Sequence, residues 1–126
     1  MSAADLQDAQ ATEDRSDCEV DRGACSKHVG SHEVIFEITP KPVKTMRELG
    51  FVVMISGLTG KGELRVDLRM PGMYMGKNQI LLKGDGTGRY TGKGIIPRCP
   101  SGGRLWEAKV NIPGTGTAEF LFNVTY

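Results

Sequence analysis

Residues 63–70 constrain the fold of this chain more than any other segment, because polar and apolar side chains alternate there without interruption. The apolar positions are Leu64, Val66, Leu68 and Met70, and a charged residue stands before each of them. Successive side chains of a β-strand point to opposite faces, so this pattern produces one apolar face and one charged face. It predicts a half-buried strand of an antiparallel sheet.

Six further segments carry apolar residues in a strand-like pattern, and Gly- or Pro-containing turn segments separate many of them. These six segments are residues 34–38, 51–55, 77–82, 88–96, 106–112 and 118–126. The 17 Gly and 6 Pro residues of the chain suit the many turns that such a fold needs. We therefore predict an all-β fold, an immunoglobulin-like β-sandwich of about seven antiparallel strands, with Trp106 in its core.

Charge divides the chain into two parts. Residues 1–24 carry seven acids and two bases, whereas residues 25–126 carry fourteen bases and eight acids. Residues 1–17 have no run of large apolar side chains whose burial would offset the entropy of ordering them. We predict an acidic, mostly disordered tail at residues 1–24, with residues 1–17 disordered, and one β-sandwich domain at residues 25–126.

Composition and motifs exclude several classes of protein. The net charge of +1 argues against a general nucleic-acid binder, and no segment approaches the roughly 18 apolar residues of a membrane-spanning helix. The Gly-rich residues 84–94 are no phosphate-binding loop, because Gly94 stands where Ser or Thr is required. Neither His28 nor His32 has a recognisable orienting partner for nucleophilic catalysis, so we expect a protein that is not an enzyme. We also expect a monomer.

The three cysteines of the chain indicate the cellular compartment in which the protein resides. Cys18 and Cys25 flank a turn-like segment, and Cys99 lies in a loop rich in Gly and Pro, which is typical of disulfides rather than of core thiols. Three single pairings are possible. Joining either Cys18 or Cys25 to Cys99 would close a long loop and contribute roughly 4 kcal/mol, and we favour Cys25–Cys99. The sequence shows no signal peptide, which fits a cytosolic protein or an exported domain without its leader; the cysteines favour export.

Residues 70–78 hold three of the six methionines, Met70, Met73 and Met75, around a Pro-Gly turn. A thioether is a soft ligand that suits Cu(I), and Met73 and Met75 point to the same side of an extended segment. His28, His32 or an unpaired thiol could complete a copper site. The alternative is that these methionines fill the end of the core, since Met packs well into irregular gaps.

The run from Val66 to Gly76 resembles the signature of the YtkA-like domain family of bacterial exported proteins. Two later segments are also similar to that family, namely residues 86–92 and residues 103–106 with the strand that follows. The resemblance covers roughly residues 30–126. It implies an immunoglobulin-like β-sandwich outside the cytoplasm, often near the membrane and near copper handling or the assembly of respiratory oxidases. The cysteine set departs from the simplest family pattern.

We therefore expect a non-enzymatic, periplasmic or otherwise extracytoplasmic protein that binds copper or assists a copper or redox protein of the periplasm or membrane. The alternative is a metal-free structural or protein-interaction module of a periplasmic or membrane-associated complex. A thiol redox protein is the third hypothesis, but the chain has no Cys-x-x-Cys motif.

Overall fold

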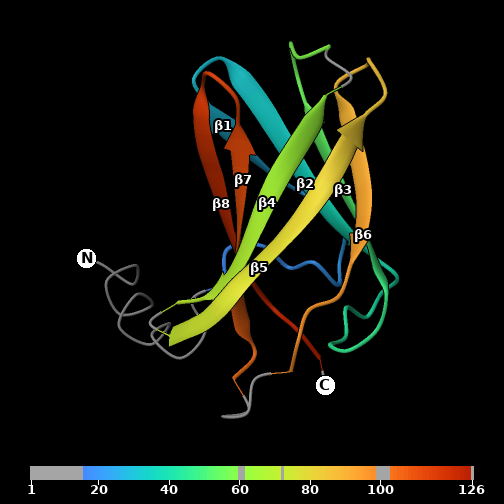
Figure 1. Cartoon of the computed structure of the whole chain (residues 1–126), viewed down its shortest axis with the longest axis vertical. Helices are drawn as coiled ribbons and strands as arrows, with labels where there is room; N and C mark the ends of the chain where they lie inside the picture. Colours follow the sequence, from blue (N-terminus) through green and yellow to red (C-terminus); the bar gives the residue numbers. More distant parts are fainter. Residues whose placement is uncertain (1–15, 60–61, 72, 99–102, 126) are drawn as a thin grey trace, which may run out of the picture.

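The computed structural model describes residues 16–59, 62–71, 73–98 and 103–125, and for residues 73–77 it describes the backbone alone. All regular structure in these residues is β-strand, as the sequence predicts (Figure 1). The strands are β1 (Cys25–Val29), β2 (His32–Thr39), β3 (Leu49–Ile55), β4 (Glu63–Met70), β5 (Met73–Gly84), β6 (Arg89–Gly94), β7 (Leu105–Ile112) and β8 (Gly116–Asn123). No helix among the described residues could cross a membrane.

The eight strands form one antiparallel sheet in the order β1-β2-β3-β6-β5-β4-β7-β8. The first and last strands of this order, β1 and β8, approach each other, so the sheet curves round until it is nearly closed. Its two four-stranded halves are joined through only two residue pairs of β5 and β6, Lys83 with Thr91 and Gly84 with Tyr90. The observed architecture is thus one continuous sheet of eight strands, where two separate sheets with about seven strands were predicted.

Strand β4 spans the residues that the alternation predicts, and its apolar side chains are all buried. The core lies inside the curved sheet and is centred on Phe36 of β2. The ring of Phe36 stacks on that of Phe120 at 5.0 Å between centroids and also contacts Phe51 and Phe122. Trp106 is fully buried, which confirms its assignment to the core. These aromatic contacts hold the two halves of the sheet together across the interior.

Strand β1 has no counterpart among the predicted strands. Its sequence, Cys-Ser-Lys-His-Val, contains no run of alternating large apolar residues because the strand lies at the edge of the sheet. Lys27 occupies the inward position that would otherwise hold an apolar residue. Its ammonium group lies 5.3 Å from the Phe120 ring centroid and donates hydrogen bonds to Asp17 and to the Glu119 carbonyl.

Residues 16–24 close the seam between β1 and β8. The amides of Asp17 and Cys18 both donate to the carbonyl oxygen of Leu121 on β8, at 2.8 and 2.9 Å. Cys18 is bonded to Cys25 on β1 by a disulfide, with 5.6 Å between the two Cα atoms. The segment is therefore attached to both edges of the sheet.

The predicted Cys25–Cys99 disulfide is wrong, because Cys25 pairs with Cys18. The physical reason is local: the hydrogen bonds to Leu121 hold Cys18 beside the start of β1. Cys99 lies outside the described residues. Part of the predicted tail also packs on the domain, since Cys18 and Val20 are buried in the core and the Asp21 carboxylate accepts a hydrogen bond from the Val43 amide.

Candidate functional site

The Met-rich segment forms the hairpin between β4 and β5. Met70, the last residue of β4, is the register partner of Met73, the first residue of β5. The register shifts between Leu68 and Met70, so β5 contains extra residues that have no partner on β4. On its other side, β4 pairs with β7 only as far as Arg69. The tip of the hairpin therefore extends past the end of that pairing (Figure 1).

Met70 lies on the inward face and is 7% exposed. Trp106 takes the neighbouring inward position on β7, one residue beyond the Arg69–Glu107 pair. The indole Nε1 of Trp106 is buried and has no hydrogen-bond partner among the residues that the structure describes. Met70 and Trp106 are thus both part of the buried hydrophobic core.

Met73 and Met75 belong to β5, but their side chains lie outside the described part of the structure. Their backbone placement is still informative. Cβ atoms of directly opposed residues in an antiparallel pair lie about 4.5–5.5 Å apart. The pairing of Met70 with Met73 thus places the backbones of two methionine residues opposite each other at the end of the hairpin.

The two histidines lie at the opposite end of the sheet. His28 and His32 belong to the β1–β2 hairpin, and the His32 ring Nδ1 is 2.5 Å from the carbonyl oxygen of Ser56, just after β3. Strand β4 begins at the end of the sheet that holds this hairpin, and Met70 is its last residue (Figure 1). A strand of that length spans roughly 25 Å. The structure thus does not bring the two histidines to the methionine hairpin within one molecule. In the described part of the chain, no group of three or more His, Cys, Asp or Glu could hold a metal ion.

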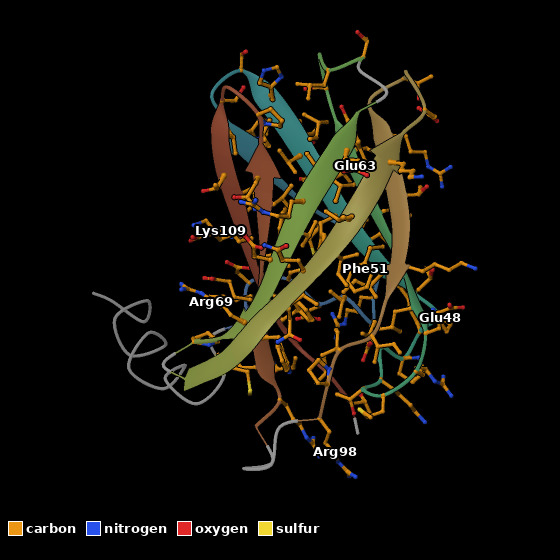
Figure 2. The ribbon with its side chains drawn as sticks, in the orientation of Figure 1. Glu48, Phe51, Glu63, Arg69, Arg98 and Lys109 are labelled. Carbon is orange, nitrogen blue, oxygen red and sulfur yellow. A yellow bond between two sulfur atoms is a disulfide. The ribbon has the colours of Figure 1, made fainter. Side chains whose placement is uncertain are left out.

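One charged pair beside the hairpin, Arg69 with Glu107, could not be predicted from the sequence. Glu107 is 7% exposed and accepts a hydrogen bond from Nε of Arg69 across the β4–β7 register. Figure 2 labels Arg69 on β4. This hydrogen bond, together with the charge of Glu107, raises the pKa of Arg69 above its ordinary value. The opposite charges are visible in the sequence, but their contact depends on a strand register that the sequence does not display.

Comparison of the chain with protein-family models, with curated proteins and with solved structures found no significant match.

Proposed function

We propose that this chain is a non-enzymatic, exported domain that binds Cu(I) at the β4–β5 hairpin and assists a copper or redox protein. The observation that carries the proposal is the register pairing of Met70 with Met73, with Met75 two residues further along β5. Thioethers are neutral, soft donors that favour Cu(I) and need not lose a proton to bind it. His28 and His32 are not part of the proposed site, because they belong to the other end of the sheet.

Two observations support an extracytoplasmic location. The Cys18–Cys25 disulfide is a feature of oxidising compartments. The resemblance of residues 66–76 to the YtkA-like domain family points to the same compartment. We further propose that the fold is of the immunoglobulin-like kind, and the two four-stranded halves that share one aromatic core support this assignment.

Competition for Cu(I) with a chromogenic chelator tests the proposal. We expect the full chain to bind one Cu(I) with a Kd of about 1 μM or tighter. Replacing both Met73 and Met75 with Leu keeps side-chain volume and apolar character but removes the sulfur donors, so the affinity falls at least about tenfold. Met54→Leu is the matched control, since Met54 is an exposed methionine on β3. An affinity that is unchanged in the double variant contradicts the proposed site.

A further inference from the structure

Met46, in the loop between β2 and β3, has two features that are unfavourable for a methionine. Its φ angle is 62°, in the left-handed region that Gly, Asn and Asp tolerate better than Met does. Its side chain is also 66% exposed, although it is apolar. Because both features cost free energy, a methionine held in this way indicates a role for its side chain at the surface.

Backbone hydrogen bonds fix this loop to two other segments. The Met46 amide donates to the carbonyl oxygen of Ile96 at 2.9 Å, just after β6. The Thr45 amide donates to the carbonyl oxygen of Thr125 at 3.0 Å, just after β8. The exposed position of Met46 is therefore set by contacts with both segments, and its amide already has a hydrogen-bond partner.

A second exposed apolar residue, Ile95, lies at the same end of the sheet. Leu49 and Gly94 pair in register as the first residue of β3 and the last residue of β6. Met46 precedes Leu49 by three residues and Ile95 follows Gly94 directly, so both lie beyond the end of the sheet drawn at the bottom of Figure 1. Ile95 is 54% exposed. We call these two exposed side chains, Met46 and Ile95, the apolar tip.

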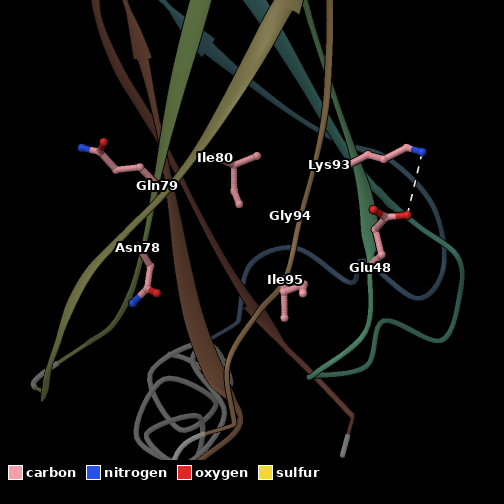
Figure 3. Close-up of a pocket in the computed structure, with 7 residues that line it drawn as sticks. All are labelled: Glu48, Asn78, Gln79, Ile80, Lys93, Gly94 and Ile95. Carbon is pink, nitrogen blue, oxygen red and sulfur yellow. Dashed lines mark ion pairs between the residues drawn. The ribbon is translucent and has the colours of Figure 1, made fainter.

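Positive charge is concentrated in the two segments that carry the apolar tip. Residues 44–48 and 93–98 contain four bases and one acid, a net charge of +3. The bases are Lys44, Arg47, Lys93 and Arg98. The acid, Glu48, forms an ion pair with Lys93 at 3.8 Å, and both side chains are largely exposed (Figure 3). Because exposed ion pairs contribute little, this pair leaves the segments strongly attractive to an anionic surface.

From these observations we infer that the apolar tip docks on the surface of a membrane that contains anionic lipids. Met46 and Ile95 enter the boundary between headgroups and acyl chains, and the neighbouring bases pair with lipid phosphates. The Met46 amide can enter this layer at small cost, because it is already hydrogen-bonded. A protein partner fits less well, since a specific interface needs about 800 Å² on each side, far more than two side chains provide.

The apolar tip lies at the same end of the sheet as the β4–β5 hairpin. Strands β5 and β6 are antiparallel, so β5 begins at the end where β6 finishes. A protein docked in this way holds the hairpin close to the lipid surface. The docking surface itself does not involve the proposed copper site, and its test needs no metal.

Co-sedimentation of the full chain with lipid vesicles tests this docking. We expect binding to vesicles made of equal amounts of phosphatidylcholine and phosphatidylglycerol, weakening as salt is added. Binding to phosphatidylcholine alone should be at least about tenfold weaker.

Met46→Asn separates the role of the side chain from any effect on folding. Asn suits the left-handed backbone, so the variant should be at least as stable as the parent chain in urea unfolding. It lacks the apolar side chain, so its binding to the anionic vesicles should weaken at least about tenfold. Met46→Leu keeps the apolar character and should retain the affinity of the parent chain.

Matched substitutions distinguish this surface from the rest of the molecule. Ile95→Thr should weaken vesicle binding about tenfold, whereas Leu81→Thr, at the same 54% exposure on β5, should not. Arg47→Gln should weaken it about fivefold. Lys83→Gln, the same change of charge beside the β5–β6 turn, should leave it unchanged.

Four results overturn the inference. They are an absence of binding to the anionic vesicles, equal binding to phosphatidylcholine alone, full affinity of Met46→Asn, and equal effects within the matched pairs of substitutions. Binding of a poly-glutamate peptide that Met46→Asn weakens, without any binding to vesicles, assigns the apolar tip to an acidic protein partner instead.

Discussion

Reducing the Cys18–Cys25 disulfide is expected to destabilise the protein at the seam between β1 and β8. The bridge connects residues seven positions apart and attaches the segment that joins these two strands. Two consequences follow from its reduction. The unfolded chain gains conformational freedom, and the segment around Cys18 loses its covalent attachment to β1.

The expected loss of unfolding free energy on reduction has a lower and an upper bound. Releasing a loop of this length costs about 2.5 kcal/mol of folding free energy in the chain-entropy treatment. If the segment also detaches, the two hydrogen bonds to Leu121 are lost, at about 1 kcal/mol each. Exposing the buried Val20 side chain adds about 1.5 kcal/mol. Reduction should therefore lower the free energy of unfolding by about 2.5 to 6 kcal/mol, and the melting temperature by about 10 °C or more.

Urea unfolding with and without a phosphine reductant measures this loss. A Cys18→Ser/Cys25→Ser variant should have the stability of the reduced protein and should not respond to the reductant. Cys99→Ser should respond as the parent chain does, because Cys25 is bonded to Cys18 rather than to Cys99. The reasoning fails if reduction changes the free energy of unfolding by less than about 1 kcal/mol, or if the Cys99 variant no longer responds.

Three further predictions concern the core, a turn and the join between β5 and β6. Phe120→Ala removes a fully buried ring and should cost about 3–5 kcal/mol in urea unfolding. Thr87→Val removes the hydroxyl hydrogen bond that, with the Thr87 amide, lowers the pKa of Asp85, so an NMR titration should show that pKa rising toward its ordinary value. A lowered carboxyl pKa contributes stability that is present above about pH 4 and lost on further acidification, so this variant should lose less stability in acid than the parent. Gly92→Ala places a Cβ against the backbone oxygen of Leu81 and should destabilise the protein by about 1–3 kcal/mol in urea unfolding, whereas an unchanged midpoint would contradict that contact.

The elements that the sequence predicts best are those whose pattern reflects burial on one face. The alternation of residues 63–70 gives both ends of β4, because each apolar side chain there reaches the core. Strand β1 was not predictable in this way. It lies at an edge, where the Lys27 ammonium group lies over the Phe120 ring and donates hydrogen bonds to Asp17 and to the Glu119 carbonyl. Such a role depends on tertiary contacts and leaves no periodic signal in the sequence.

The candidate site, too, was predictable from the sequence only where it depends on residues close together in the chain. Local spacing singles out Met70, Met73 and Met75, and the observed hairpin pairs Met70 with Met73 in register, with Met75 two residues further along β5. The distance between this hairpin and His28 or His32 follows from strand direction, which spacing alone does not determine. The join between the two halves of the sheet, with its two register pairs of β5 and β6, likewise becomes visible only in three dimensions.

X-ray absorption at the copper edge tests the central claim most directly. The sample is the full chain carrying Cys99→Ser, loaded with one equivalent of Cu(I), so that the thioethers are the only sulfur donors outside the disulfide. The account predicts a copper shell dominated by sulfur, which disappears when Met73 and Met75 are replaced by Leu. A shell of nitrogen from His28 and His32, unchanged in that double variant, would contradict it.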